Sequence, residues 1–396
     1  MSKITLPFGI EVPKFLKNIF DSKSSFEKTN REKIYVIGNG WGSYFFVKNL
    51  DKSKFEPVII APNKKVLNTP RLVNLLTEPE PNALVEFENP YGEIIQDMLD
   101  DINLNSKELI TKSGIKYPYT KIVLSIGSEP NDFGIQGVNT NTYKFKTIED
   151  ANLLREKIST MSVNNNIYIV GSGITGIEIA SKLGNIFNIK VIEGMGMILP
   201  GYNDITKNII LEHLKKTQRY INIDTNTLVK FISDTYIRVN KIKSNELINL
   251  NFDNKKDLII WSGGVRINGY GKKTQLFNKL NNIIQDVKCD ETISIKPRGI
   301  DVEENFKIKS DLDIYCIGDM VANKGPSSAQ NARVQGEWLA NYFNSGFDKE
   351  FLRTNKYEIK SRGKLVHLID DIYLESEYYS GFIPKFIDKI IEWINI

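Results

Sequence analysis

Residues 166–187 read NIYIVGSGITGIEIASKLGNIF, and the interpretation of the whole chain starts from this stretch. An apolar run leads into Gly171-Ser172-Gly173-Ile174-Thr175-Gly176, and a helical pattern follows at once. This is a full G-x-G-x-x-G match in a strand–turn–helix context, the arrangement that places a dinucleotide pyrophosphate at a helix N-terminus. Glu193 closes the next apolar run, KVIEG at 190–194. An acid at that position accepts hydrogen bonds from adenosine ribose hydroxyls and repels a 2′-phosphate, which favours NADH over NADPH.

A similar turn occurs earlier, in residues 33–50, which read KIYVIGNGWGSYFFVKNL. Gly38 permits a tight turn after the strand, and Gly40 lets the backbone approach a pyrophosphate. The third motif position is Ser43, which is small enough for close packing of the helix on the strand. Two such turns in one chain predict two nucleotide-binding domains.

The first turn lacks the acid of the second. The equivalent strand end falls at Ile60-Ala61. The ribose of a nucleotide bound there needs another partner, either the backbone near Pro62-Asn63 or Lys64.

Further apolar runs indicate the rest of the architecture. Helix 147–158 begins at Thr147, with Asp150 placed as in a capping box, and residues 227–240 alternate as a hairpin around Ser233-Asp234. Buried strands are expected at 57–62, 121–127, 190–194, 257–264 and 312–319. Repeated strand–helix units with apolar strands predict an α/β fold in which helices cover parallel sheets, with two Rossmann-like domains.

Composition excludes several classes of function. The chain has 396 residues, and its 52 basic and 48 acidic residues give a net charge of +4, too balanced to indicate a nucleic-acid partner. Its two cysteines and two histidines are isolated in sequence, which argues against a disulfide framework and against a metal site. No apolar run is long enough to span a membrane, and no targeting peptide is evident. We expect a reducing compartment such as the cytosol.

Four stretches together resemble a known family. They are IGNGWGSYFFVKNLD at 37–51, YTKIVLSIGSEPNDFGIQGV at 119–138, VGSGITGIEIA at 170–180 and DIYCIGDMVANKGPSSAQNARVQGEWLANYFN at 313–344. They are similar to the flavoproteins with two dinucleotide domains, and within these to the type II NADH:quinone oxidoreductases. The resemblance runs from about residue 33 to about 345.

The resemblance implies a domain organisation. An FAD-binding domain would comprise 33–146 and 256–345, and an NAD-binding domain would be inserted at 147–255. Residues 1–32 would form an N-terminal extension, and 346–396 a C-terminal segment with an amphipathic helix.

The resemblance also implies site residues. FAD would be the first cofactor and NADH the reductant, with Asp319 bonded to the flavin's ribityl chain. Glu178 would lie near the nicotinamide and Gln330 near the quinone. The residues implied to contact FAD are Gly38, Gly40, Trp41, Gly42, Asp319 and Ala329; those for NADH are Gly171, Gly173, Gly176 and Glu193. Residues 38–80 contain no cysteine, which excludes the disulfide reductases of this fold and its single-cysteine peroxidases. Cys316 is expected to be a small core residue.

The resemblance is weaker near the quinone pocket. The family pattern A-Q-x-A-x-Q reads Ala329-Gln330-Asn331-Ala332-Arg333-Val334 here, so valine replaces the second glutamine, and Gln335 follows one position later. One residue rotates a helical side chain by about 100°. The alternative interpretation is that small residues only pack this helix against the flavin. Gln136 also replaces a family proline, and Trp261-Ser262-Gly263-Gly264-Val265 either closes a strand near the flavin or ends it structurally.

The C-terminal segment has an amphipathic pattern. Apolar residues recur at helical spacing from Ile383 to Ile394, with Lys385 and Lys389 beside them and Trp393 near the end. A shorter stretch, Val12 to Phe20, is similar in character. The composition suits a helix lying in a membrane interface on the cytoplasmic side, where a lipophilic quinone is reached. The alternative is a helix packed on the protein's own core or on the partner in a homodimer.

Two rival functions stay open. One is a soluble NAD(P)H flavoprotein reductase of the apoptosis-inducing-factor or ferredoxin-reductase type. The other is a non-catalytic flavin-binding module, which the missing acid at Ala61 and the altered Val334 motivate.

Overall fold

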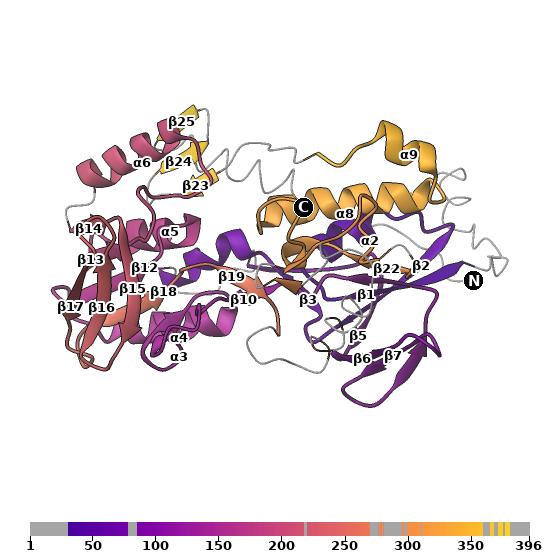
Figure 1. The fold of residues 1–396 in the computed structure, drawn as a ribbon, viewed down its shortest axis with the longest axis horizontal. Helices are drawn as coiled ribbons and strands as arrows, with labels where there is room; N and C mark the ends of the chain where they lie inside the picture. Colours follow the sequence, from indigo (N-terminus) through magenta and orange to yellow (C-terminus); the bar gives the residue numbers. More distant parts are fainter. Residues whose placement is uncertain are drawn as a thin grey trace, which may run out of the picture.

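The computed structural model has two lobes joined by two short strands, β10 and β19 (Figure 1). It describes residues 31–77, 85–217, 220–269, 276, 278, 280, 295–296, 299–309, 311–358, 365–367, 371–374 and 377–380. The stretch Val12 to Phe20, Cys289 and the C-terminal amphipathic pattern therefore lie outside the described residues.

The first lobe is built on a five-stranded parallel sheet. Its spatial order is β22 (Ile314–Cys316), β9 (Lys121–Leu124), β1 (Glu32–Ile37), β2 (Phe55–Ala61) and β5 (Glu93–Gln96). The inner strands are apolar and almost wholly buried, as strands covered on both faces must be. Helix α2 (Trp41–Asn49) follows β1, and helix α8 (Ala329–Asn344) packs along it.

The second lobe repeats this plan. Its parallel sheet has the order β11 (Tyr143–Lys144), β18 (Leu258–Trp261), β12 (Asn166–Val170), β13 (Asn188–Ile192) and β14 (Ile221–Asp224). Helices α4 (Ile148–Ser159) and α5 (Ile174–Leu183) contribute to its core. The predicted capping box is present, since Thr147 and Asp150 exchange side-chain-to-backbone hydrogen bonds. The α/β fold class with two Rossmann-like units is thus confirmed.

Sheet membership extends the second lobe beyond the expected range of 147–255. Strand β11 pairs with β18, and β18 pairs with β12, so residues 143–144 and 258–261 belong to the second sheet. Both pairings are parallel, so β18 lies beside β12 and β11 lies beside β18. We therefore propose that the domain limits lie at the two crossings between the lobes, which contain β10 (Ser128–Pro130) and β19 (Val265–Ile267).

The predicted hairpin is also present, with one strand more than expected. Strands β15 (Thr227–Ile232) and β16 (Tyr236–Lys241) pair antiparallel, and β17 (Glu246–Asn251) pairs with β16. The Ser233 hydroxyl oxygen accepts hydrogen bonds from the backbone N–H groups of Thr235 and Tyr236, which fixes the turn.

Apart from the 14-residue helix α6, the remaining elements are short. They are β3 (Lys65–Leu67), η1 (Thr69–Leu76), β4 (Glu86–Glu88), β6 (Leu99–Asn103), β7 (Glu108–Thr111), β8 (Lys116–Pro118), α3 (Val138–Asn141), α6 (Asp204–Thr217), β20 (Ile295–Lys296), β21 (Gly299–Ile300), η2 (Gly318–Met320), α9 (Lys349–Thr354), β23 (Leu365–His367), β24 (Asp371–Leu374) and β25 (Glu377–Ser380).

Cys316 is a core residue, as predicted. It lies on β22 with no exposed surface, and burial raises the pKa of its thiol well above the usual range. A thiol held neutral in this way is not a nucleophile.

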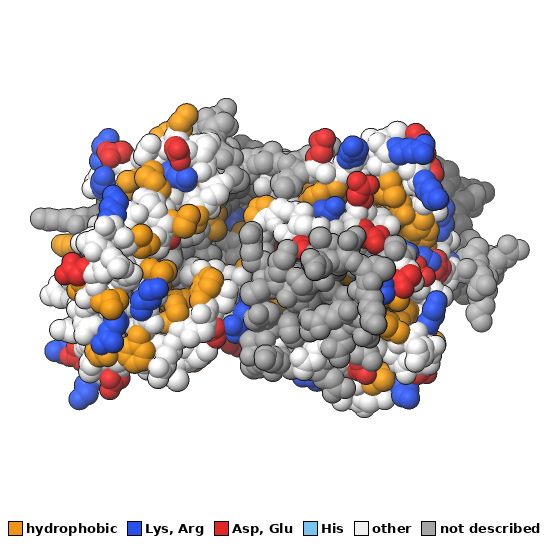
Figure 2. All heavy atoms as spheres, in the orientation of Figure 1, with side chains coloured by type: hydrophobic (Ala, Val, Ile, Leu, Met, Phe, Trp, Pro, Cys, Tyr) orange, Lys and Arg blue, Asp and Glu red, His pale blue; other side chains and the backbone are white. Residues whose placement is uncertain are grey.

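The surface carries charges of both signs. Figure 2 shows basic and acidic side chains interspersed over both lobes on the face in view. Within the described residues, no helix combines the length and the apolar character needed to span a bilayer.

Helix α8 approaches helix α2 through a glycine. A Cβ at Gly336 would lie 2.4 Å from the carbonyl oxygen of Gly42 and 2.9 Å from the backbone nitrogen of Phe46. Because both neighbours are backbone atoms, the helices can accommodate a side chain only by separating. This contact holds the first glycine turn against the rest of its lobe.

The substitution Gly336→Ala should therefore destabilise the first lobe by about 1–3 kcal/mol, the usual cost of overpacking. The thermal unfolding midpoint measures the effect. Asn341→Ala is the matched control, because Asn341 is exposed on the same helix and should change little. Equal midpoints for Gly336→Ala and the wild type would contradict this packing.

Candidate functional site

The second glycine turn forms an open cradle at the N-terminus of α5. Gly171 has φ +99°, and a Cβ there would lie 2.5 Å from the carbonyl oxygen of Ser262, so the turn requires glycine. Gly173 caps α5 without a side-chain bond, and a Cβ there would meet nothing within 4 Å. Gly176 lies against the turn itself, because a Cβ there would be 2.1 Å from the Gly171 carbonyl oxygen. Gly173 thus leaves open space at the N-terminus of α5, the end of a helix where N–H groups lack intrahelical partners, and this suits a bound phosphate.

Glu193 lies at the edge of this cradle, where the sequence predicts it. Its side chain is 7% exposed and is held at both oxygens. Oε2 accepts hydrogen bonds from the backbone N–H and the hydroxyl of Ser172, at 2.7 and 2.6 Å, and Oε1 accepts from the Met195 N–H at 2.7 Å. Three donors hold the carboxylate in a single orientation at the end of β13. The role of Ser172 was not predicted, because its motif position is unrestricted.

The first glycine turn has the same geometry. Gly38 has φ +107°, and a Cβ there would lie 2.2 Å from the carbonyl oxygen of Ser125. Gly40 caps α2 without a side-chain bond, and nothing lies within 4 Å of a Cβ placed there. A Cβ at Gly42 would lie 3.0 Å from the Ser125 hydroxyl oxygen, so this position also favours glycine. This cradle also suits a pyrophosphate.

In the first turn an asparagine makes the side-chain hydrogen bonds that the missing acid does not make. Ala61 ends β2 and is buried, as the sequence implies. The Asn39 amide nitrogen instead donates to the Lys64 carbonyl oxygen at 2.8 Å, and its oxygen accepts from Asn89 at 2.8 Å. These bonds fix the loop after β2 beside the glycine turn. Asn39 is a functional candidate that the sequence did not single out.

Trp41 contacts the two strands that follow this loop, β3 and β4. Its indole N–H donates to the Leu67 carbonyl oxygen at 3.1 Å, and its ring stacks on Phe45 and meets the edge of Phe87. The Trp41 side chain therefore packs α2 against the β3–β4 pair. A cofactor contact by its backbone stays a prediction.

Asp319 lies where the first sheet meets the second lobe. It follows β22 and Gly318, whose φ is +80°. Its Oδ2 accepts from the Ser128 hydroxyl at 2.7 Å and pairs with the Lys146 ammonium at 3.3 Å. Both of these contacts are made by Oδ2, and within the described part of the chain Oδ1 accepts no hydrogen bond. Lys146 follows β11, so this ion pair joins the two lobes.

Gln330 and Gln335 both lie on α8, but their surroundings differ. Ser328 caps the helix, with its hydroxyl accepting from the Asn331 N–H, and Ala329 begins it. Gln335 has no exposed surface, and its Oε1 accepts from the Gly318 N–H at 2.7 Å. Gln330 and Val334 lie one helical turn apart and are half-buried. Gln335 is therefore a structural residue that fixes the turn before Asp319, and it does not replace the missing second glutamine.

Two further predicted positions, Glu178 and the stretch from Trp261 to Val265, lie around the second glycine turn. Glu178 lies on α5 and is 6% exposed, but its place beside a nicotinamide stays a prediction. In the stretch from Trp261 to Val265, the Ser262 hydroxyl donates to the carbonyl oxygens of Val170 and Gly171, so this residue closes the second cradle. Its relation to a flavin also stays a prediction.

Gln335→Leu should leave the buried Gly318 N–H without a partner and cost about 1–3 kcal/mol in stability. Gln330→Leu, on the same helix, should leave stability nearly unchanged. Thermal unfolding of both variants is the measurement. If the two variants unfold at the same temperature, the structural role of Gln335 is wrong.

Comparison with known proteins agrees with this geometry. Residues 32–336 match the family described as pyridine nucleotide-disulphide oxidoreductase. A relative from Dictyostelium discoideum named "Probable NADH dehydrogenase" is 27% identical over 382 residues, which cover 82% of this chain and 78% of the relative. An external alternative NADH-ubiquinone oxidoreductase from Yarrowia lipolytica is 24% identical, and the match covers 80% of this chain but 60% of that protein.

A solved structure has the same fold. The structure of NDH2 from Plasmodium falciparum in complex with NADH superimposes with a TM-score of 0.74 at 19% identity, covering 91% of this chain and 94% of that chain. The names of these relatives agree with the resemblance drawn from the sequence, and the family match spans both glycine turns and the Asp319 region. This chain belongs to the pyridine nucleotide-disulphide oxidoreductase family.

Proposed function

We propose that this chain is an FAD-dependent NADH dehydrogenase that passes electrons to a quinone. One observation carries the proposal. Two open glycine turns follow strands of two separate parallel sheets. Of these two turns, only the second has a carboxylate at the end of the next strand, Glu193, whose orientation is fixed by hydrogen bonds. Two different dinucleotides are thereby accommodated in one chain, and one cradle selects against a 2′-phosphate.

FAD fits the first cradle. The N-terminus of α2 and the open space at Gly40 suit its pyrophosphate, and Asp319 offers an oxygen to a ribityl hydroxyl. With Ala61 in place of an acid, the loop fixed by Asn39 supplies backbone carbonyl groups near the adenosine ribose. A bound flavin accepts a hydride from a reduced nicotinamide and delivers two electrons to an acceptor.

NADH fits the second cradle. The N-terminus of α5 would hold its pyrophosphate, and Glu193 would accept from the adenosine ribose. The overall reaction balances: NADH, a proton and a quinone give NAD⁺ and a quinol. The protein's part is to bind and orient the two nucleotides and to keep water away from the point where they meet. Glu178, buried on α5, is the acid that we place nearest the nicotinamide.

The quinone is the acceptor that the relatives favour. The Yarrowia lipolytica relative is named an NADH-ubiquinone oxidoreductase. Gln330, half-buried at the beginning of α8, offers an amide for a quinone carbonyl. Val334 makes the next turn of that helix apolar, and this departure favours a soluble NAD(P)H flavoprotein reductase as the second candidate.

We further propose that the enzyme is peripheral to a membrane, on the cytoplasmic side. The support is the amphipathic pattern from Ile383 to Ile394, with two lysines and a tryptophan beside its apolar positions. A homodimer contact is the alternative use of the same pattern.

An anaerobic visible spectrum tests the proposed function. The FAD-loaded protein should lose its flavin band at about 450 nm when NADH is added, because hydride transfer reduces the flavin. A short-chain quinone should then restore the band. A flavin that NADH leaves unchanged would instead favour the non-catalytic binding module, and a band that only soluble protein acceptors restore would favour the soluble reductase.

Removal of the Glu193 charge should weaken the discrimination against NADPH. In Glu193→Gln the rate of flavin bleaching by NADPH, relative to NADH, should rise by about tenfold or more, equivalent to roughly 1.4 kcal/mol. Asp253→Asn is the charge-matched control, because Asp253 is an exposed-loop carboxylate paired with Lys256. An unchanged ratio in Glu193→Gln would place the nucleotide selection elsewhere.

A further inference from the structure

The two lobes are joined by two chain crossings that are bonded to each other. Strand β10 carries the chain from the first lobe into the second, and β19 carries it back. The two strands pair antiparallel, with Glu129 opposite Arg266. The Asn131 N–H also donates to the Gly264 carbonyl oxygen at 2.9 Å. The two crossings thus form one two-stranded antiparallel sheet.

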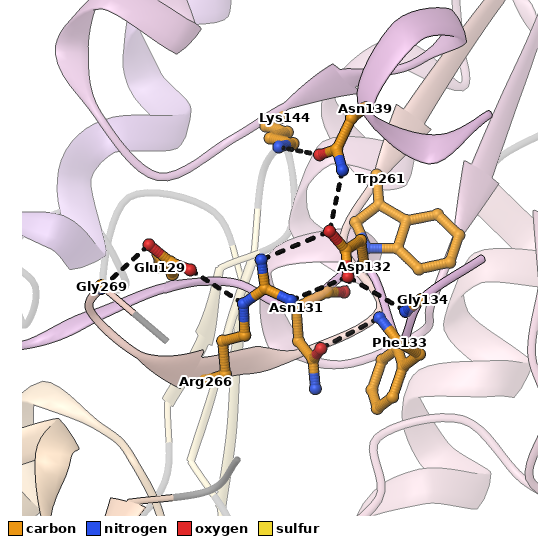
Figure 3. Close-up of polar contacts among 10 residues, drawn as sticks. All are labelled: Glu129, Asn131, Asp132, Phe133, Gly134, Asn139, Lys144, Trp261, Arg266 and Gly269. Atoms are coloured by element: carbon orange, nitrogen blue, oxygen red, sulfur yellow. Dashed lines mark hydrogen bonds and ion pairs between the residues drawn. The ribbon is translucent and has the colours of Figure 1, made fainter. Parts of the chain in front are cut away.

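Arg266 binds two carboxylates of the opposite crossing. Its Nε donates to Glu129 Oε1 at 2.8 Å, and its two terminal nitrogens donate to Asp132 Oδ1 and Oδ2 at 2.8 and 3.3 Å (Figure 3). The guanidinium therefore holds one carboxylate by two parallel bonds and a second one by a third bond. A planar fork with fixed donors restricts direction as well as distance.

Both carboxylates are held by further donors. The second oxygen of Glu129 accepts from the Gly269 N–H at 3.1 Å. Asp132 accepts from the Gly134 N–H at 3.0 Å and from the Asn139 amide at 2.8 Å. Figure 3 shows Lys144 at the far side of Asn139, where its ammonium donates to the amide oxygen. Because Lys144 lies on β11, these bonds run from the crossings into the second sheet.

The network is shielded from water. The side chains of Arg266, Asp132 and Glu129 are 13%, 14% and 21% exposed. Burial tends to raise the pKa of Asp132, but hydrogen bonds from Gly134, Asn139 and Arg266 together with the arginine's charge outweigh it and lower the pKa to about 2. The carboxylate therefore stays ionised throughout the neutral range. Nearby, the Trp261 indole N–H donates to the Asn131 carbonyl oxygen at 2.8 Å and fixes the end of β18 to the same crossing.

We propose that Arg266, with Glu129 and Asp132, is a positioning residue that fixes the angle between the two nucleotide-binding lobes. The proposal rests on the proposed function, in which hydride transfer requires the nicotinamide held in one lobe to meet the flavin held in the other. A small angular error at the crossings grows with distance toward the cradles. Displacement of reacting atoms by about 1 Å costs on the order of a hundredfold in rate.

The experiment compares Arg266→Met with the matched control Arg238→Met. Arg238 is also a strand arginine with a side-chain partner, Asn249, but it lies on the β15–β17 sheet away from the crossings. Spin labels at Asn105→Cys and Lys243→Cys, both exposed and one in each lobe, report the distance between lobes by pulsed electron resonance in a Cys289→Ser background. Stopped-flow bleaching of the flavin gives the rate of reduction at saturating NADH and, separately, the NADH affinity.

For Arg266→Met we expect a broadened inter-lobe distance distribution. The rate of flavin reduction should fall by about tenfold to a hundredfold, the effect of misplaced reacting atoms, while the NADH affinity stays nearly unchanged. Arg238→Met should match the wild type in both. Arg266→Lys, which keeps the charge but not the fork, should fall between. Asp132→Asn, nearly isosteric, should show the same broadening if Arg266→Met fails to fold.

An unchanged distance distribution in both Arg266→Met and Asp132→Asn would overturn the proposal. So would a fall in unfolding temperature with neither broadening nor slower reduction, since that is the signature of a merely structural ion pair. The distance measurement does not depend on catalysis. If NADH fails to bleach the wild-type flavin, the proposed function fails while the distance result still decides the role of the network.

Discussion

The close approach of a glycine turn to the carbonyl group of a neighbouring strand is the constraint on which this structure depends. It occurs twice, at Gly38 beside Ser125 and at Gly171 beside Ser262. In each case any side chain would collide with a backbone oxygen, so the strand, the turn and the following helix can pack only with glycine there. That packing brings the helix N-terminus to the carboxyl end of the sheet, where Gly40 in one turn and Gly173 in the other leave open space. The binding chemistry of both lobes follows from this contact.

The two cradles differ in what surrounds them. In the second, the unrestricted motif position is Ser172, which directs two hydrogen bonds at Glu193. In the first, the same position is Asn39, which fixes the following loop because no acid is available at Ala61. Under the proposed function, the second cradle would recognise a ribose through the charge of Glu193, and the first would hold its nucleotide through backbone and loop. This asymmetry would separate a resident cofactor from an exchangeable substrate.

Much of this could be predicted from the sequence, because the decisive signals are local. Glycine spacing and the Thr147 capping box each need only a few consecutive residues, and Glu193 is found at the end of the strand that follows the second turn. Other features depend on contacts between distant segments. Neither β18's membership of the second sheet nor the burial of Gln335 against Gly318 has a local signature. The Arg266 network joins residues more than a hundred positions apart, and its arginine lies in an ordinary strand. Strands β6–β8 span only three to five residues, too few for a distinctive alternation. Strand β17 is mostly exposed, so no buried apolar face marks it.

The central claim is that one chain holds two different dinucleotides at once, in separate cradles. Calorimetric titration of NAD⁺ into the FAD-loaded protein, followed by measurement of the flavin that stays bound, tests it directly. We expect one NAD⁺ to bind per chain with FAD occupancy unchanged. If NAD⁺ instead displaces FAD, or binds only to protein stripped of flavin, the two nucleotides share one site and the two-cradle assignment is wrong.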